Sequence, residues 1–248
     1  MPGTHSRFLA AVSCALLVGC SQSAPKTSPQ LGTSQQGLNQ SITFAFPNFP
    51  SASLLQLNGS ASVSGNSVLI TPSGGSQAGS FFCTQKVSLQ NNRSFSTYFQ
   101  MRMTNPGGGG ADGLVFVIQP NSNTAGSLGG GLGYQGITNS FGVEFDSYQN
   151  AAPFNDPDNH HLGTHTNGNM NGHLAVASNP TLWSDGATYN VWIDYNGLTQ
   201  GLEVRVNRNS NVRPASPVLT QTIDLSSVFG VDQVYAGFTA ATGGAWEA

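Results

Sequence analysis

The stretch Val143-Glu-Phe-Asp-Ser-Tyr-Gln-Asn-Ala-Ala-Pro-Phe-Asn-Asp-Pro-Asp-Asn-His-His-Leu-Gly163 contains the densest set of polar side chains in this chain. Glu144 and Asp146 lie two residues apart, so on a strand both point to one face and their apolar neighbours point to the other. Two adjacent carboxylates repel each other and are costly to bury, and a bound cation removes that conflict. The stretch therefore predicts a strand that ends at a metal site; the alternative is a solvated acidic loop.

The loop after this strand offers further ligands, namely Asn150, Asp156, Asp158, His160 and His161. Oxygen atoms of carboxylates, amides and backbone carbonyls suit calcium. A histidine added to carboxylates suits a transition metal such as manganese or zinc. A carboxylate shared between two ions would hold them next to each other.

On both sides of this stretch the chain shows short strands and turns. Apolar residues alternate with polar ones in 95–103, 189–195 and 202–206, an unbroken apolar run covers 114–118, and 234–241 is a further strand candidate. Asn196-Gly197 predicts a turn, and Leu225–Phe229 predicts one short helix. Many short strands and no internal repeat predict an all-β fold, an antiparallel β-sandwich or jelly roll.

The composition narrows the choice of partner. The 248 residues have a formal net charge of -3 and only 8% charged residues, with 31 glycines and 38% apolar residues. Few charges and many turn formers suit strands joined by loops, in one large domain or two small ones. The absence of a basic stripe in the sequence argues against nucleic acid as a partner. The sequence is compatible with a monomer or an oligomer.

The N-terminus predicts export. Arg7 precedes an apolar run from Phe8 to Val18, which is too short for a transmembrane helix but typical of a signal peptide. The run leads into Leu17-Val-Gly-Cys20, which resembles the lipobox of bacterial lipoproteins, where the peptide is cut before the cysteine and the thiol carries a diacylglycerol. We therefore expect residues 1–19 to be a lipoprotein signal peptide; the alternative is an ordinary signal peptide with an incidental cysteine.

Residues 20–40 are rich in Ser, Gln, Pro and Thr and predict a flexible tether that begins at a lipidated Cys20. Because Cys14 would leave with the signal peptide, Cys83 would be the one cysteine left in the domain, as a buried small apolar residue without a disulfide. The protein would then be exported and lipid-anchored to the bacterial membrane, at the cell surface or in the periplasm.

The opening stretch resembles the metal-binding loop of legume-type (L-type) lectins, with the pattern Glu-x-Asp-x-aromatic-x-Asn, then Asp-Pro and His-aliphatic-Gly. This chain supplies Glu144, Asp146, Tyr148, Asn150, Asp156-Pro157 and His161-Leu162-Gly163. The resemblance implies a transition metal, Mn²⁺ or another, on Glu144, Asp146, Asp156 and His161. It implies Ca²⁺ on Asp146, the Tyr148 carbonyl, Asn150 and Asp156. Asp158 and His160 are alternative ligands in a shifted register.

Further segments resemble the same family, and together they cover residues 41–248. They are Ile42–Phe49 as the first strand, Ala111-Asp-Gly113 with a cis peptide before the aspartate, the glycine-rich loop Gly129–Tyr134, and Gly237–Gly243 before the specificity loop. The resemblance implies a concanavalin A-like β-sandwich. Family members continue past the position of Glu247 into a last strand, so we expect the domain to be truncated at its C-terminus or to lack that strand.

By this resemblance the protein binds carbohydrate without catalysis. The implied sugar contacts are Asp112, Gly130, Tyr148, Asn150 and Gly244. Asp112 and Asn150 would hydrogen-bond sugar hydroxyls, the glycines would donate backbone N–H groups, and the Tyr148 ring would stack on the sugar. Trp246 is a candidate for a second stacking surface.

Two other functions remain open from the sequence. A β-glucanase of the same superfamily would need Glu-x-Asp-x-x-Glu on this strand, but Gln149 occupies the last position, so the second catalytic carboxylate is missing and we expect no enzyme activity. A non-catalytic adhesion or scaffold module would keep the metals for stability alone.

Overall fold

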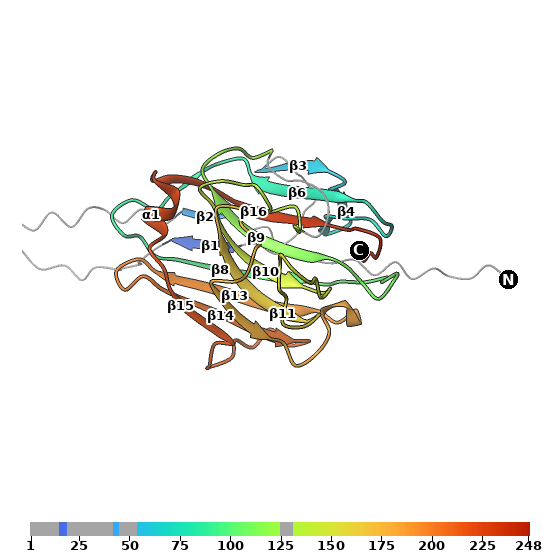
Figure 1. Cartoon of the computed structure of the whole chain (residues 1–248). Helices are drawn as coiled ribbons and strands as arrows, with labels where there is room; N and C mark the ends of the chain where they lie inside the picture. The colour runs from blue at the N-terminus through green and yellow to red at the C-terminus, as the bar shows by residue number, and fades with distance from the viewer. Residues whose placement is uncertain (1–14, 19–41, 45–53, 125–130) are drawn as a thin grey trace, which may run out of the picture.

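The computed structural model describes residues 15–18, 42–44, 54–124 and 131–248, and the side chains of the last two ranges. The described strands form two antiparallel sheets that lie face to face, with loops at both ends (Figure 1). The predicted antiparallel β-sandwich is therefore confirmed.

One sheet carries the strand with the two carboxylates. In spatial order its strands are β12 (Ala175–Ser178), β11 (His161–Thr166), β10 (Phe141–Asp146), β9 (Gly113–Gln119), β16 (Gln233–Ala241), β6 (Ala78–Cys83) and β3 (Leu55–Gly59), and β7 (Val87–Ser88) pairs with β16. Three of the six predicted metal ligands lie in the long loop between β10 and β11, and the other three lie on these two neighbouring strands, which hold both ends of the loop.

The second sheet closes the sandwich from the other side. Its order is β15 (Leu219–Thr222), β14 (Gly201–Arg208), β13 (Tyr189–Asn196), β8 (Phe95–Met101), β1 (Ala15–Val18) and β2 (Ile42–Phe44), and β4 (Ser62–Ser64) with β5 (Ser67–Leu69) forms a separate hairpin. Of the expected first strand, residues 42–44 form β2 and 45–49 lie outside the described residues. β1 falls within the predicted signal peptide, which stays a prediction.

Side-chain alternation places the core between the sheets. In β8, Phe95, Thr97, Phe99 and Met101 are buried while the residues between them are partly exposed, as the alternation predicts. The ring of Phe99 packs against Phe238, Phe145 and Phe116 of the opposite sheet, with centroids 4.8, 5.9 and 6.1 Å apart. Such offset and edge contacts between buried rings are favourable.

β9 is buried on both faces, as its unbroken apolar run predicts. Leu114, Phe116 and Ile118 join the core between the sheets. Val115 and Val117 point outward and are covered by a second cluster, formed with Phe82, Leu132, Tyr134, Ile137 and Met170. Loops therefore cover the outer face of this sheet, the face to which the buried carboxylates of β10 point.

The remaining predictions of local structure also hold. Asn196 ends β13, and its side-chain oxygen accepts hydrogen bonds from the backbone of Leu198 and Thr199, which forms the predicted turn. Helix α1 (Leu225–Phe229) is capped by the Asp224 side chain. Cys83 is buried in the core at 5% exposure. A short 3₁₀ helix spans Trp183–Asp185.

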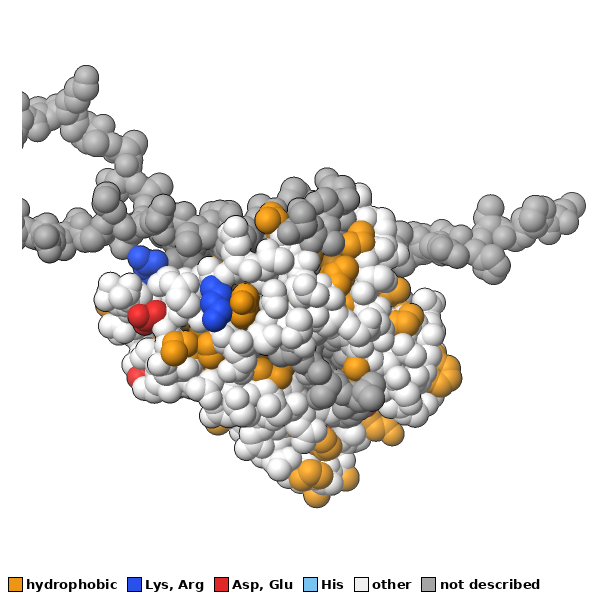
Figure 2. Space-filling view, turned by 90° about the horizontal axis from the view of Figure 1, so that it is seen from above, with side chains coloured by type: hydrophobic (Ala, Val, Ile, Leu, Met, Phe, Trp, Pro, Cys, Tyr) orange, Lys and Arg blue, Asp and Glu red, His pale blue; other side chains and the backbone are white. Residues whose placement is uncertain are grey.

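The described surface is poor in charge. On the face shown in Figure 2, the few charged side chains lie toward the left end, and the rest of the described face consists of uncharged polar and hydrophobic groups. Such a face offers a partner hydrogen bonds and apolar contacts rather than ion pairs. No helix within the described ranges has the length and apolar character needed to cross a bilayer.

Candidate functional site

β10 places two carboxylates on the outer face of its sheet. Its alternate residues, Val143 among them, belong to the core, so Glu144 and Asp146 point away from it. Both carboxylates are nevertheless buried, at 1% and 2% exposure. The alternative of a solvated acidic loop therefore does not describe Glu144 and Asp146.

The loop after β10 folds back onto these carboxylates through its own backbone. The Tyr148 N–H donates to Asp146 Oδ1 at 2.7 Å, and the Asn150 N–H donates to Asp156 Oδ2 at 2.7 Å. The Asp156 N–H in turn donates to the Asn150 carbonyl at 3.1 Å. These bonds fix one oxygen of each aspartate and leave the other oxygen available to a cation.

Burial and neighbouring carboxylates disfavour ionisation of the two aspartates in this cluster. Burial, followed by repulsion from Glu144 and Asp156, raises the pKa of the Asp146 carboxyl well above its usual value. Burial also raises the pKa of Asp156. A carboxyl that resists ionisation beside other carboxylates is a site where a divalent cation would be stabilising.

His161 lies where the resemblance implies. Its Nε2 is 3.4 Å from Glu144 Oε1 and 3.9 Å from Asp156 Oδ1. Its Nδ1 is 2.9 Å from the backbone carbonyl oxygen of Asp158. Because a carbonyl oxygen only accepts, Nδ1 carries a proton, and in the neutral form of the ring the Nε2 lone pair faces the carboxylates, an orientation typical of metal-ligating histidines. In the absence of a metal, burial opposes protonation of the ring, but Glu144 and Asp156 favour the protonated form and raise the pKa of His161.

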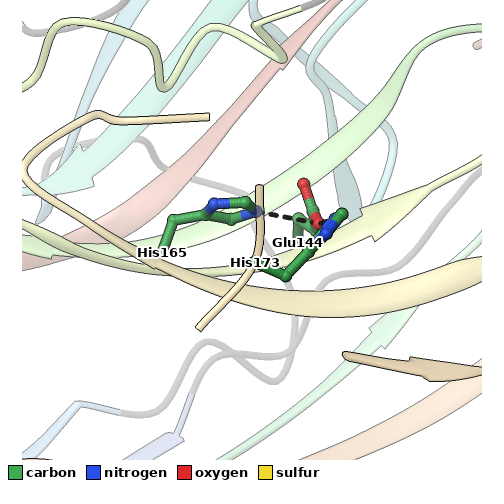
Figure 3. Close-up of side chains that lie close together, drawn as sticks. All are labelled: Glu144, His165 and His173. Carbon is green, nitrogen blue, oxygen red and sulfur yellow. Dashed lines mark ion pairs between the residues drawn. The ribbon is translucent and has the colours of Figure 1, made fainter. Parts of the chain in front are cut away.

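Two further histidines, which the sequence analysis missed, reach the same glutamate. His165 Nε2 lies 2.8 Å and His173 Nε2 lies 2.7 Å from Glu144 Oε1, and Figure 3 shows both rings directed toward that carboxylate. Burial alone would raise the pKa of Glu144, but its contacts with His161, His165 and His173 outweigh burial and hold the pKa well below its usual value. Three imidazoles around one carboxylate form a nitrogen-rich site.

The donor set fits a transition metal. In the described part of the chain, potential ligand atoms lie within 4.8 Å of one another in three groups: Glu144, Asp146 and His161; Asp156, His161 and His173; and Glu144, His165 and His173. Glu144 belongs to two of these groups, and its Oε1 is buried without a hydrogen bond of acceptable geometry. Buried polar atoms left in this way are what a bound ion would satisfy.

The neighbouring oxygen atoms fit calcium. Asn150 Oδ1 is buried without a hydrogen-bond partner, and it lies on the loop that Asp146 and Asp156 hold in place. Carboxylate and amide oxygens are the ligands that Ca²⁺ prefers. Asp158 is engaged elsewhere, because it accepts hydrogen bonds from Ser178 Oγ and the His160 backbone, and neither Asp158 nor His160 belongs to a described ligand group. The shifted register therefore finds no support.

An open pocket adjoins the part of the cluster that contains Asn150. It is lined by Gly108, Ala111, Asp112, Tyr148, Asn150, Gly243, Gly244 and Ala245. Four of the five predicted sugar contacts thus lie together, and the fifth, Gly130, lies outside the described residues. Tyr148 is 40% exposed and Gly244 is exposed, so the pocket presents a ring and free backbone.

Asp112 lies at the base of this pocket. The Ala111–Asp112 peptide is cis, as the resemblance implies. The Asp112 N–H donates to the Ala241 carbonyl at 3.1 Å, and its own carbonyl accepts from the Ser147 N–H at 3.2 Å. Burial, followed by repulsion from Asp156, raises its pKa to about 6, and its Oδ2 is buried without a hydrogen bond.

Glu247 is a second buried carboxyl that the sequence analysis did not assign to the site. Its Oε1 accepts a hydrogen bond from Ser147 Oγ at 2.5 Å, while its Oε2 is buried without one. Burial, followed by repulsion from Asp112, raises its pKa to about 7. Glu247 therefore supports, through Ser147, the start of the loop that follows β10.

Two other residues have packing roles. A Cβ on Gly107 would lie 2.2 Å from Trp246 Cε2, so the indole covers Gly107 and packs there instead of lining the pocket. Gln149 is exposed, and its amide donates to the Asp156 and Pro157 carbonyls at 3.3 and 3.2 Å. Its side chain thus stabilises the loop backbone and does not pair with Glu144.

Comparison with known proteins places this architecture in a family. The sequence pattern described as "Legume lectin domain" matches residues 41–248. The L-type lectin-domain containing receptor kinase VIII.1 of Arabidopsis thaliana is 37% identical over 163 residues, which cover 62% of this chain and 22% of the kinase. Kinase IV.2 of the same plant is 29% identical over 231 residues, 83% of this chain and 34% of the kinase. The chain thus spans about a fifth to a third of these relatives.

Solved structures of legume lectins have the same fold as this chain. The basic winged bean lectin with Tn-antigen is 28% identical, with a TM-score of 0.70 over 82% of this chain and 88% of that chain. The lectin from Bauhinia forficata in complex with GalNAc shows the same fold at 24% identity, with a TM-score of 0.69 over 82% of this chain and 91% of that chain. With the family pattern matched over residues 41–248, the chain belongs to the legume lectin family.

Proposed function

We propose that this protein binds carbohydrate reversibly in the pocket around Asp112, and that a calcium ion and a transition-metal ion hold the pocket in its binding form. The observation that carries the proposal is the pair of buried oxygen atoms without hydrogen bonds, Asp112 Oδ2 and Asn150 Oδ1, in a pocket that also exposes the Tyr148 ring. Buried acceptors of this kind need donors or a cation, which sugar hydroxyls and Ca²⁺ supply.

Each pocket residue would have a distinct role. Asp112 would accept hydrogen bonds from sugar hydroxyls, and an ionised acceptor makes the stronger bonds. Asn150 would give its oxygen to Ca²⁺ and its amide N–H to the sugar. Tyr148 would place its ring on the apolar face of the sugar, and Gly244 would offer its backbone N–H. The metals would bring these groups together by neutralising Asp146 and Asp156.

The legume lectin fold supports carbohydrate binding without catalysis. The geometry is unfavourable for the β-glucanase alternative, because a catalytic carboxyl must reach the glycosidic bond. Glu144 is 1% exposed and lies among three histidines, and Gln149 makes amide hydrogen bonds to the loop backbone. Binding is therefore the function that these side chains favour.

A glycan array probed with and without chelator tests the proposal. We expect the full chain to bind a defined set of glycans, to lose binding in EDTA, and to regain it when Ca²⁺ and a transition metal are added together. The array should include the Tn antigen and galactosides, because the winged bean lectins were solved with Tn-antigen and with methyl-α-D-galactose. Binding that survives chelation would contradict the metal dependence. Chelation that lowers Tm in a protein with no glycan partner would favour the scaffold module.

We further propose that the protein is exported and anchored to the bacterial membrane by lipid on Cys20, which lies outside the described residues. Each buried lipid CH₂ contributes about 0.8 kcal/mol, so two or three acyl chains would anchor the protein firmly. In fractionated cells, Cys20→Ala should move the protein from the membrane to the soluble fraction, while Cys14→Ala, six residues earlier, should leave it membrane-bound. Equal partitioning of wild type and Cys20→Ala would refute the anchor.

A further inference from the structure

His173 brings a second imidazole to the proposed transition-metal site. Its ring is 7% exposed, with Nε2 placed 3.1 Å from His161 Nε2 and 2.7 Å from Glu144 Oε1. The residues on either side are tied down, because the Gly172 N–H donates to the Phe154 carbonyl at 3.1 Å and the Leu174 N–H donates to the Thr164 carbonyl at 2.9 Å. The ring is thus held between the metal-binding loop and β11.

Hydrogen bonding alone leaves this arrangement unsatisfied. The Asp158 carbonyl accepts a hydrogen bond from His161 Nδ1–H, so in the neutral ring, which is the form that binds a metal, Nε2 presents a lone pair. That lone pair and Glu144 Oε1 are both acceptors, and both face His173 Nε2, which carries at most one proton. One proton can form a hydrogen bond to one of these acceptors. A cation placed between them would be coordinated by both acceptors and by the lone pair of His173 Nε2 as well.

The spacing of the nitrogen atoms is that of two ligands on one ion. With Zn–N bonds of about 2.0–2.1 Å, two nitrogen ligands lie about 3.3 Å apart in tetrahedral geometry and about 2.9 Å apart at a right angle. The observed separation of 3.1 Å between His161 Nε2 and His173 Nε2 lies between these values. Asp156 Oδ1 is 3.9 Å from each of these nitrogens, which leaves room for an ion among the three groups.

β11 is shaped to admit the second ring. Gly163 pairs with Glu144 in the sheet, and a Cβ on Gly163 would lie 2.3 Å from Glu144 Oε1 and 2.4 Å from His173 Cδ2. Any other residue at this position would occupy the space in which the carboxylate and the His173 ring meet. The bare Cα of Gly163 is therefore a structural requirement for the approach of His173.

We propose that His173 is a direct ligand of the transition-metal ion, beside His161. This second imidazole makes the site prefer zinc, or another ion that favours nitrogen ligands, over manganese. Imidazole suits zinc, copper, iron and nickel, whereas carboxylate, carbonyl and water ligands suit manganese. The inference rests on the metal site of the proposed function. His165 is assigned no ligand role, because it shares no described ligand group with Asp156 or His161.

Metal titrations of the full chain, without sugar, test this inference. The protein is stripped of metal, loaded with Ca²⁺, and titrated with Zn²⁺, Co²⁺ or Mn²⁺, with the Co²⁺ absorption spectrum recorded at each step. Wild type should bind Zn²⁺ at least about 100-fold more tightly than Mn²⁺. His173→Ala should weaken Zn²⁺ and Co²⁺ binding by about 10- to 100-fold and change the Co²⁺ spectrum, with far less effect on Mn²⁺.

Two variants make the result specific. His173→Asn replaces imidazole by an amide and should shift the preference toward Mn²⁺, which also covers the case in which His173→Ala folds poorly. His160→Ala is the matched control, because His160 is a neighbouring histidine whose ring is 30% exposed and belongs to no described ligand group. Unchanged Zn²⁺ affinity and an unchanged Co²⁺ spectrum in both His173 variants would overturn the inference.

The two proposals can fail separately. A wild-type protein that binds Zn²⁺ tightly through His173 but binds no glycan would refute the proposed function and leave the ligand assignment intact. A wild type that binds glycan with Mn²⁺ and Ca²⁺ but shows no preference for Zn²⁺ would refute the ligand assignment alone. A protein that binds no transition metal at all would refute both the assignment and the metal dependence.

Discussion

Asp146→Asn is expected to release both metal ions and to abolish glycan binding. Because the family resemblance places Asp146 in both ligand sets, we propose that it bridges the two ions. It is 2% exposed, and one of its oxygens is already held by the Tyr148 N–H. Asparagine keeps the size and can keep that hydrogen bond, so the loss isolates the charge. Without the carboxylate, each site loses an anionic ligand at once, and metal binding is coupled to the folded loop.

The measurements are metal analysis after dialysis, glycan titration and thermal unfolding. We expect metal content to fall from two ions per chain to a small fraction of that, and glycan affinity to fall by at least about 100-fold, as when a charge-assisted contact and its support are lost. The Tm should drop to that of the chelated wild type, because ions that bind only the folded state stabilise it. Asp158→Asn is the control, since that neighbouring carboxylate belongs to no described ligand group. Full metal content in Asp146→Asn would show that the bridge is misplaced.

Strands were the most predictable part of the fold, because periodicity reports burial directly. The alternating residues of 189–195 and 202–206 predicted two half-buried strands, and they pair across β13 and β14 with Ile193 opposite Val204 and Tyr195 opposite Leu202. The unbroken run of β9 predicted burial on both faces. Periodicity does not encode which loop residues cover the outer face of β9. Leu132 and Met170 are among them, and their placement depends on tertiary packing.

The metal-binding loop was predictable for a different reason. Its ligands lie close together in sequence, so spacing alone brings Glu144, Asp146 and Asn150 to one end of a strand. His165 gave a signal that was overlooked: it follows His161 by four positions on the same strand and therefore shares its face. A reading of β11 with period two would have found it.

His173 and Glu247 gave no such signal. His173 lies in the connection between β11 and β12, where the backbone bonds of Gly172 and Leu174 help to hold it beside Glu144. Glu247 lies about a hundred positions after Ser147 in the sequence, and it accepts a hydrogen bond from the Ser147 hydroxyl. Contacts between distant segments depend on the register of the whole sandwich, so they follow from the structure and not from a local pattern.

Asp112→Asn is expected to abolish glycan binding while leaving both metals in place. Asp112 Oδ2 is buried, has no hydrogen bond and lines the pocket, so a sugar hydroxyl is its natural donor. Asparagine would remove the charge and replace the carboxylate by an amide, whose NH2 group donates hydrogen bonds instead of accepting them. Since hydrogen bonds to a charged group contribute about 1.5–3 kcal/mol each, loss of one or two predicts at least about 10- to 100-fold weaker binding.

The same residue predicts a pH dependence. Burial, followed by repulsion from Asp156, raises the Asp112 pKa to about 6, so the carboxylate that binds sugar is mostly ionised above pH 7 and affinity should fall as the pH is lowered through about 6. A calcium ion beside Asp156 opposes the repulsion and would move the midpoint lower. Metal content must be measured at each pH, so that protonation of Asp112 is distinguished from release of the ions.

Calorimetric titration of a glycan found on the array, beside metal analysis, decides the Asp112 prediction. Asp112→Asn should retain two ions per chain and a Tm close to wild type, because no ligand group includes Asp112. Asp232→Asn, at an exposed position outside the pocket, should bind glycan as wild type does. Wild-type affinity in Asp112→Asn would place the sugar elsewhere on the molecule, and loss of metal in that variant would mean that Asp112 supports the ions and not the sugar.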